Sequence, residues 1–447
     1  HSIEEIQSLH RKKTGRIIME KTKQAQKEAE NGNEKTSNNL EYEVDYEKWS
    51  KAHLIDRIRQ LEKLSPNFVP FNGVGPQKRL DAKGKKAFDF SKHQTRFIGL
   101  RFSYLGWNYQ GLAVQKEDTD LPTVEFEIIK ALNKIKLVNS FKPSDFNFSR
   151  CGRTDRGVSA MNQVISLDVR SSLTADELTD VKNDVKEIDY VRILNQIISP
   201  DIRFHSVCLR PPENFDARFS CISRHYKYIF NGEGLDIEKM NEGAKKFLGQ
   251  HDFRNVCKID ASKQITNFTR NIMSSKIERL PTREGFYIFD LKGSAFLWHQ
   301  VRCMVAVLLL IGQGHEQPEI IDKLVNIEEF PSRPTYNMAH DIPLVLYDCE
   351  FPDDVKWICG DQIDRKVNHH LDMNGVWYEL QVKSILADFM RDIVYKNCPV
   401  KFDRLVTNLG DGIGKTAQKY TPLNKRSRLD TAEVLNEKWR NKKARNQ

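Results

Sequence analysis

The sequence predicts an α+β protein, in which two mixed αβ halves with antiparallel-rich sheets lie between helical N- and C-terminal extensions. Three observations lead to this fold class. Short segments alternate apolar and polar residues as β-strands do, and longer segments repeat apolar residues at helical spacing. The same order of strands and helices then begins a second time. The chain has 447 residues, which is enough for several domains.

Composition and periodicity divide the chain into four parts. Residues 1–94 form a charged N-terminal extension with an amphipathic helix and a linker. Residues 95–218 form the first αβ half, and residues 219–351 form the second. Residues 352–447 form a C-terminal extension that ends in a basic tail.

The N-terminal extension contains one strongly periodic segment, residues 47–64. Its apolar residues recur at helical spacing: Trp49, Leu54, Ile58 and Leu61. We expect this helix to pack on its own chain, and packing on a partner helix is the alternative. The same stripe is the reason to expect a homodimer. Residues 65–86 combine turn residues with basic charge and are predicted to be a linker.

Strands and helices are predicted in the two halves from their apolar periods. In the first half, the strands cover residues 96–106, 163–169 and 202–209, and the helices cover residues 121–138 and 184–198. In the second half, the strands cover residues 225–230, 271–280, 286–293 and 342–351, and the helices cover residues 235–249 and 299–312.

The C-terminal extension is predicted to contain a helix near residues 375–395. Residues 424–447 are basic and polar, so we expect a solvated, disordered tail. Contact with RNA and a nuclear address are the alternatives for this tail.

Charge and cysteine usage narrow the class of protein. The net charge of +9 fits an anionic partner such as nucleic acid, although many ordinary proteins are equally basic. None of the eight cysteines forms a CxxC pair, so we expect scattered reduced thiols and no metal site. The longest apolar run, residues 305–311, is too short to span a membrane. These features predict residence in the cytoplasm and the nucleus, with no membrane partner.

The most unusual stretch is SRCGRTDRGVSA, residues 149–160, which holds charges between glycines directly before a strand. The glycines allow a tight turn around Asp155, and a loop at a strand end is a rigid mounting for a catalytic group. A partly desolvated carboxylate stays ionised more readily beside a guanidinium. Arg153, two positions away, is a better neighbour for it than Arg156. On composition alone, a turn with an exposed ion pair is the simpler interpretation.

Five motifs in order resemble those of the TruA family of tRNA pseudouridine synthases. GRTDRGVSA, residues 152–160, is similar to the family's active-site motif GRTDxGVxA. Four further segments resemble family motifs: YLGWNYQGLAVQ (104–115), FDARFSCISRHYKYIF (215–230), GQHDFRNVC (249–257) and SAFLWHQVRCMVAVLLLIGQG (294–314). Together these motifs cover residues 96–350.

The resemblance implies an enzyme that isomerises uridine to pseudouridine in tRNA, which it holds in a basic cleft between the two αβ halves. The uracil is detached from C1′ of the ribose, turned, and rejoined through C5. No redox change or group transfer occurs, so no cofactor is expected. Attack on C1′, attack on the ring, and removal of a sugar proton stay open as the pathway.

The resemblance also implies roles for individual residues. Asp155 matches the catalytic aspartate, and Tyr226 matches the tyrosine that stacks on the target uracil, although ordinary strand packing is the alternative for this ring. Arg302 matches the arginine that pairs with the catalytic carboxylate. A buried arginine at the start of an apolar helix is costly unless an anion answers it, so we expect a direct contact between Arg302 and Asp155. Three residues match positions that hold the substrate: Arg153, Arg218 and Lys227. Three others are interpreted as structural: Cys151, His251 and His299.

Within the family, residues 149–172 are most similar to the eukaryotic branch that modifies positions 38 and 39 in the anticodon arm of tRNA. The related branch that acts on other sites carries Ala where this chain has Gly152. The partner is therefore expected to be the anticodon stem-loop of tRNA. Two alternatives stay open: a family member that acts on other tRNA or RNA uridines, and a tRNA-binding protein without catalysis. The chain departs from the usual motifs at Ala306, Asp341 and Ile342, which concerns local loop shape.

Overall fold

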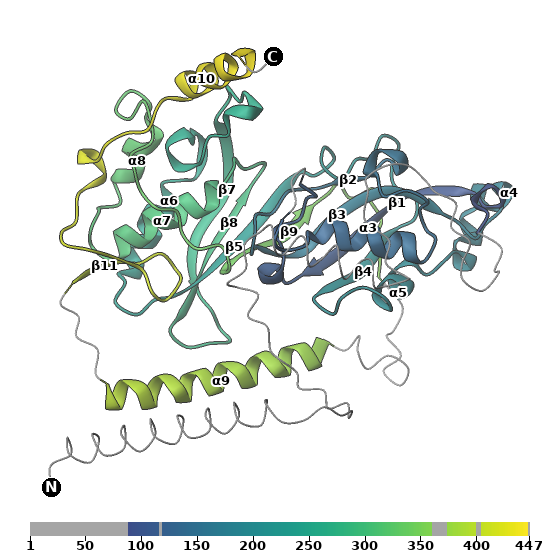
Figure 1. The fold of residues 1–447 in the computed structure, drawn as a ribbon, viewed down its shortest axis with the longest axis horizontal. Helices are drawn as coiled ribbons and strands as arrows, with labels where there is room; N and C mark the ends of the chain where they lie inside the picture. Colours follow the sequence, from purple (N-terminus) through teal and green to yellow (C-terminus); the bar gives the residue numbers. More distant parts are fainter. Residues whose placement is uncertain (1–87, 116–118, 360–372, 399–403, 446–447) are drawn as a thin grey trace, which may run out of the picture. The chain divides into compact units, whose positions relative to one another are not determined.

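The structure is a computed structural model, and it describes residues 88–115, 119–359, 373–398 and 404–445. The predicted amphipathic helix at residues 47–64 and the linker at residues 65–86 lie outside these described residues. Within them, strands and helices form a mixed α+β fold around a large sheet (Figure 1). Among the described helices, none combines the length and the apolar character that a membrane span requires.

Ten strands of the described chain form one continuous sheet. Its order is β10-β4-β1-β3-β9-β5-β8-β7-β6, with β2 paired to β3 off this path. The strands contributed by the first predicted half are β1 (Thr95–Tyr104), β2 (Ser149–Arg150), β3 (Ser159–Arg170) and β4 (Ile202–Cys208). Those of the second are β5 (Ser223–Asn231), β6 (Gly249–Asp252), β7 (Thr269–Arg279), β8 (Phe286–Gly293) and β9 (Leu344–Glu350), and β10 (Ile358–Cys359) lies at the far edge.

The pairing of β3 with β9 joins the two sets of strands into a single sheet, where the sequence predicts separate sheets. The strands pair in antiparallel fashion everywhere along the path except between β3 and β9, which run parallel. This parallel ladder contains two residue pairs, Ser159 with Val345 and Ala160 with Leu346. Because β9 also pairs with β5, the last strand of the second set closes onto the strand that leaves the charged loop.

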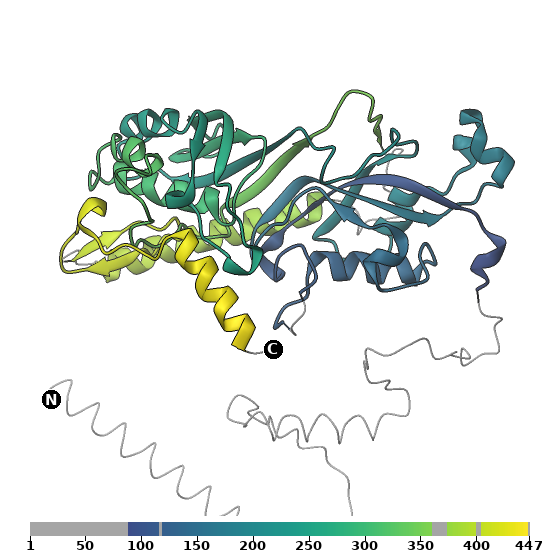
Figure 2. The same ribbon diagram turned by 90° about the horizontal axis from the view of Figure 1, so that it is seen from above.

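Helices supply the apolar side chains that cover the sheet. Figures 1 and 2 place α3 (Val124–Lys134) beside β1 and β3, and its side chains Ile128 and Leu132 are fully buried. Thr123 caps this helix by accepting a hydrogen bond from the backbone of Phe126. On the other set of strands, α6 (Ile237–Lys245) contacts both β7 and α7 (Gln300–Gly312). Every residue of α7 is buried, as its continuous apolar run predicts.

The remaining helices are short. They are α4 (Ala175–Thr179), α5 (Tyr190–Asn195), which contacts β4, and α8 (Ile320–Val325). The predicted helix at residues 184–198 is therefore shorter than expected, because a 3₁₀ segment, Val181–Lys186, precedes α5. Asp184 in this segment and Glu187 directly after it form ion pairs with the guanidinium of Arg96, at 2.7 and 3.0 Å.

The C-terminal extension contains a long helix and returns to the body of the protein. α9 (Met373–Asn397) has no buried residue and carries large exposed apolar side chains: Trp377, Tyr378, Leu386, Phe389, Met390 and Ile393. The strands β11 (Leu405–Thr407) and β12 (Lys415–Ala417) form a small second sheet. The side chain of Gln313, just after α7, bonds to the backbone of Val406 and Asn408 at 2.8 Å each and so fixes this sheet.

The expectation of a disordered tail after residue 424 is wrong for most of that segment. Residues Ala432–Arg445 form α10, and Asn436 within it is buried. Arg440 donates to the side chain of Gln264 at 2.8 Å, and Glu433 lies 3.4 Å from Arg254. Polar contacts with the connection between β6 and β7 order a segment whose composition alone is typical of a solvated tail.

Candidate active site

The charged loop lies between β2 and β3, and its first turn is fixed by the strand that follows it. The backbone N–H of Cys151 donates to the carbonyl of Val164 at 2.9 Å. The buried side chain of Gln163 then holds Gly152 from both sides. Its amide nitrogen donates to the Gly152 carbonyl at 3.0 Å, and its amide oxygen accepts from the Gly152 N–H at 3.4 Å.

The far side of the loop is held by the segment that follows β1. Leu112 donates its N–H to the carbonyl of Thr154 at 3.2 Å. At Gly111, which has φ +96°, a Cβ would lie 2.7 Å from that same carbonyl oxygen, so only glycine permits this approach. The Tyr104 hydroxyl bonds to the Thr154 hydroxyl at 2.7 Å. Residues 104–112 therefore pack against the loop and fix its backbone at Thr154.

A tight turn presents the carboxylate of Asp155. The N–H of Val158 donates to the Asp155 carbonyl at 3.2 Å, and Gly157 within the turn has φ +78°. The Asp155 side chain is 30% exposed, which leaves it accessible and partly desolvated. The sequence prediction of a loop that projects one carboxylate from the end of a strand agrees with this geometry.

The side chain that faces the Asp155 carboxylate is the imidazole of His299. Its Nε2 atom lies 3.3 Å from Oδ2 of Asp155, and its side chain is only 10% exposed. His299 precedes α7 and has φ +57°, an unusual conformation for a residue that is not glycine. Its Nδ1 atom is buried and has no hydrogen-bond partner among the described residues. The interpretation of His299 as purely structural therefore missed the residue that faces the carboxylate.

Arg302 does not make the direct contact with Asp155 that was expected. Its guanidinium lies 4.0 Å from the carboxylate of Asp341, and its Nε donates to the Ala339 carbonyl at 2.8 Å. The physical argument that a buried arginine requires an anion holds, but Asp341 is that anion. A Cβ on Gly157 would lie 3.0 Å from the Asp341 carboxyl carbon, so this ion pair adjoins the far end of the loop.

Tyr226 lies in β5, and its ring meets the ring of Phe296 edge to face with centroids 5.1 Å apart. Burial raises the pKa of Tyr226, and the negative charge of Asp155 adds to this rise despite the opposing charge of Arg224. Tyr226 therefore lies within electrostatic reach of Asp155 and keeps its proton at any ordinary pH. A protonated phenol in this place can donate a hydrogen bond and can present a ring face.

The three predicted substrate-binding residues have different surroundings. Arg153 and Arg218 are exposed, and Arg218 lies over the ring of Phe219 at 5.1 Å. Lys227 neighbours Tyr226 in a strand, so it points to the opposite face of the sheet. There its ammonium lies 3.7 Å from the Tyr347 ring centroid and 3.9 Å from Asp290. The structure does not bring Lys227 to the site.

Arg224 is the residue that sequence reasoning overlooked. It shares the face of Tyr226 because the two are two positions apart in β5. Its guanidinium donates to three carbonyls at 2.9–3.0 Å: those of Cys151, Arg218 and Ser294. It thus joins the start of the loop to the segments before β5 and after β8. The sequence feature that could have identified Arg224 is its position two residues before Tyr226 in the same motif, because this spacing puts the two side chains on one face of a strand.

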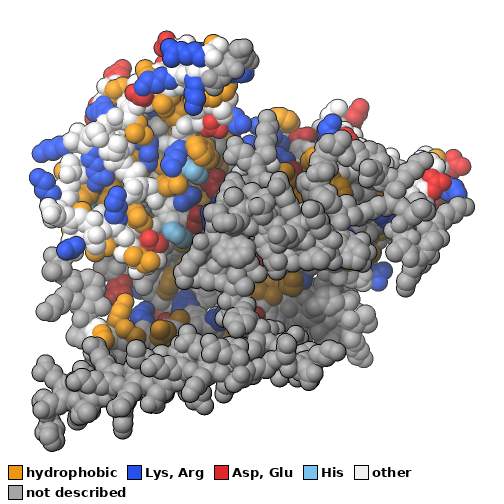
Figure 3. All heavy atoms as spheres, viewed as in Figure 1, with side chains coloured by type: hydrophobic (Ala, Val, Ile, Leu, Met, Phe, Trp, Pro, Cys, Tyr) orange, Lys and Arg blue, Asp and Glu red, His pale blue; other side chains and the backbone are white. Residues whose placement is uncertain are grey.

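Charge on the visible surface does not mark one binding face. Figure 3 shows Lys and Arg side chains dispersed among hydrophobic and uncharged ones over the part of the described chain that this view leaves uncovered. The site is therefore described by the geometry around Asp155: a rigidly held carboxylate, an imidazole against it, and a buried tyrosine ring that its charge influences.

Comparison with known proteins agrees with this class of site. Residues 244–352 match the family model described as tRNA pseudouridine synthase. A protein of Saccharomyces cerevisiae, tRNA pseudouridine(38/39) synthase, is 53% identical over 411 residues, which cover 89% of this chain and 92% of the relative. Proteins with the same description from Bos taurus and Homo sapiens are 43% and 45% identical, over 74% and 68% of this chain and 70% and 64% of their own lengths.

The descriptions of these relatives name one activity, tRNA pseudouridine synthesis. The chain belongs to the TruA family of tRNA pseudouridine synthases.

Proposed function

We propose that this protein isomerises uridine to pseudouridine at positions 38 and 39, in the anticodon arm of tRNA. Its relatives in yeast, cattle and human are described by that activity, and the yeast protein matches nearly the whole chain. The single observation that carries the proposal is the placement of Asp155, on a loop whose backbone is bonded on both sides, with its carboxylate still accessible.

In this proposal Asp155 is the catalytic residue that starts the detachment of uracil from the ribose. The carboxylate can act as a nucleophile or can remove a proton from the sugar, and either role requires its ionised form. His299, 3.3 Å away, orients the carboxylate and favours that form when it carries a proton. The ion pair of Arg302 with Asp341 supports the loop from its other end and acts through position rather than contact with substrate.

Tyr226 is proposed to stack on the target base once that base has left its helical stack. Unstacking costs a few kcal/mol, which contacts with the RNA offset. Arg153 and Arg218 are exposed and are proposed to contact phosphates, each of which adds a salt-dependent contribution to affinity. The basic cleft is proposed to lie between the two sets of strands that meet at β3 and β9. The isomerisation transfers no electrons and no group to a second molecule, so the chain's own side chains suffice.

Gly152 is the feature that favours positions 38 and 39 over other uridines within the family. The absence of a side chain there leaves the nearest heavy atoms, Nε of Arg224 and a methyl of Leu346, 3.7 and 4.0 Å from the place of a Cβ. Residence in the cytoplasm and the nucleus, and a homodimer, are further parts of this proposal. The homodimer rests on the stripe in residues 49–61, and sedimentation of the full chain measures it.

Position-resolved mapping of pseudouridine tests the proposal. Transfer RNA that lacks the modification is incubated with the wild-type chain, with Asp155→Asn, and with Asp348→Asn as a matched change of another partly buried aspartate. The wild type and Asp348→Asn are expected to form pseudouridine at positions 38 and 39, and Asp155→Asn is expected to form none. Pseudouridine only at other positions contradicts the assigned sites, and tRNA binding by the wild type without any product supports a binding protein without catalysis.

A further inference from the structure

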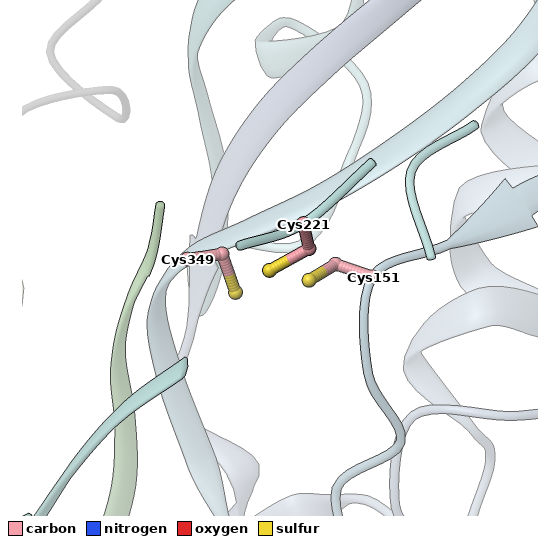
Figure 4. A group of neighbouring side chains, drawn as sticks. All are labelled: Cys151, Cys221 and Cys349. Carbon is pink, nitrogen blue, oxygen red and sulfur yellow. The ribbon is translucent and has the colours of Figure 1, made fainter. Parts of the chain in front are cut away.

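Three cysteines that are far apart in the sequence meet beside the loop that carries Asp155. Cys151 begins the loop, Cys221 precedes β5, and Cys349 lies in β9. Their sulfur atoms all lie within 4.8 Å of one another, and Figure 4 shows the three side chains pointing toward a common centre. The expectation of scattered thiols is therefore wrong for these three.

We propose that Cys151, Cys221 and Cys349 form a binding site for one thiophilic d¹⁰ metal ion, Zn²⁺ or Cu⁺. The first argument is geometry. Metal–sulfur distances of about 2.3 Å around one ion place the sulfurs about 4 Å apart, and the three sulfurs already lie within that range of approach. Thiolate sulfur selects Zn²⁺ and Cu⁺ over the harder ions Mg²⁺ and Ca²⁺.

The second argument is burial. Cys151 and Cys349 are 1% and 0% exposed, and Cys221 is half-buried, so an ion here would be shielded from chelators in solution and reached from the side of Cys221. Among the hydrogen bonds of the described chain, only that from Cys221 to the Ser223 carbonyl, at 3.3 Å, uses any of the three thiols.

The third argument is charge. Three buried thiolates repel one another and need a compensating positive charge. Arg224 supplies one positive charge beside them, since its guanidinium donates to the Cys151 carbonyl at 2.9 Å. Three thiolates, one divalent ion and this guanidinium sum to zero.

Charge balance favours Zn²⁺, and the number of ligands favours Cu⁺. Zn²⁺ usually takes a fourth ligand, and the cluster within the described residues offers three. The two ions share one coordination chemistry, and the experiment distinguishes them.

Such an ion would connect three segments near the place where β3 pairs with β9. One of its ligands, Cys151, lies four residues before Asp155 in the sequence. Cys349 lies opposite Arg224 in the β5–β9 ladder, and Cys151 bonds to β3. The inference concerns the metal content of the chain and stands independently of the proposed function, since it is measured without RNA.

The metal content of the full chain tests the inference. Wild-type protein is purified without chelator under reducing, oxygen-free conditions, and bound zinc and copper are measured by mass spectrometry of the elements. One equivalent of either ion is expected in the wild type and in two controls, Cys208→Ser, which alters a buried cysteine outside the cluster, and the double variant Cys359→Ala with Cys398→Ala, which removes two exposed thiols. Cys221→Ser and Cys349→Ser are expected to lose it.

Co²⁺ titration of the wild type covers the case in which a serine variant fails to fold. A sulfur-to-metal charge-transfer band that saturates at one equivalent is expected, and competition by Zn²⁺ or by Cu⁺ identifies the preferred ion. X-ray absorption is expected to show three sulfur neighbours at about 2.3 Å. A wild type without this band, equal loss of metal in the controls and the cluster variants, or a disulfide between two of the three cysteines would overturn the inference.

Discussion

His299 holds its Nε2 atom 3.3 Å from Oδ2 of Asp155, although its neighbours in the chain give no sign of such a role. His299 has a left-handed backbone, with φ +57°, at the position directly before α7. The imidazole is fixed on a carboxylate that comes from a segment more than a hundred residues away in sequence.

Replacement of His299 is expected to lower turnover without weakening tRNA binding. His299→Ala removes the imidazole that faces the Asp155 carboxylate, and a loss of about 1.4–2.8 kcal/mol of transition-state stabilisation is expected to reduce kcat about 10- to 100-fold. KM is expected to stay unchanged, because the imidazole contacts Asp155 rather than the RNA. Single-turnover kinetics and tRNA binding measure the two quantities. His251→Ala, which removes a partly exposed imidazole elsewhere, is the control, and an equal loss of tRNA affinity in His299→Ala would contradict a positioning role.

A double-mutant cycle is expected to show that Arg302 interacts with Asp341. Arg302→Met removes the guanidinium that faces the half-buried Asp341, and Asp341→Asn leaves the buried charge of Arg302 without its anion, so each is expected to lower the free energy of unfolding. Together they are expected to cost less than the sum, with a coupling of about 1 kcal/mol. Urea unfolding measures the coupling. The cycle of Arg302→Met with Asp155→Asn serves as the comparison, and a larger coupling there would restore the direct pairing that the sequence predicted.

The two glycines of the loop are expected to differ sharply. At Gly157 an alanine meets both a left-handed backbone and the Asp341 carboxylate, 3.0 Å from its Cβ, so Gly157→Ala is expected to cost about 1–2 kcal/mol and most of the activity. At Gly152 the nearest atoms lie at ordinary contact distances, so Gly152→Ala is expected to fold with wild-type stability. Thermal unfolding compares the two. Mapping of pseudouridine with Gly152→Ala then shows whether this position influences the choice of uridine.

Acid stability is expected to depend on Glu187, whose side chain is 1% exposed. Burial alone would raise the pKa of Glu187, but hydrogen bonds outweigh it and lower that pKa: those from Ser171, from the backbone of Ser172 and Ile188, and from Arg96. Because the folded pKa lies below the unfolded value, the stabilisation is complete at neutral pH and is lost as the pH falls through the carboxyl range.

Glu187→Gln is therefore expected to lower stability by about 2 kcal/mol at pH 7 and by less near pH 4, where the wild type has lost part of the same contribution. Unfolding by urea at the two pH values measures this difference. Glu213→Gln, which alters an exposed glutamate, is the control and is expected to have little effect. A loss of stability in Glu187→Gln that is the same at both pH values would show that the ionised form is not what stabilises the fold.

Periodicity was sufficient for the regular elements and insufficient for their assembly. The strands β1, β3, β7 and β8 and the helix α7 were predictable, because each pairs a clear apolar period with a buried face. The parallel joint of β9 with β3 was not, since two residue pairs leave no mark in composition. α10 was missed for a similar reason: side-chain contacts with distant residues order it, and those contacts cannot be read from a polar segment.

The residues of the site likewise fall into two groups: those that local sequence predicts and those that only the folded chain brings together. Asp155 was predictable because its motif, its glycines and the strand after it lie together in the sequence. The roles of His299, Arg224 and Asp341 depend on which distant segments meet the loop, and only the folded chain determines that. The physical rule that a buried arginine requires an anion was sound for Arg302, yet the rule does not state which of several aspartates will be near.

The two-pair ladder between β3 and β9 has a mechanical consequence. Ser159 and Ala160, which make the ladder, are the first residues after the loop that presents Asp155. A force that an incoming RNA exerts on the loop is therefore transmitted directly to the two-pair ladder that joins the two sets of strands. The same few backbone amides therefore respond to substrate binding and hold the two sets of strands together. Their rate of hydrogen exchange with deuterated water would report on both.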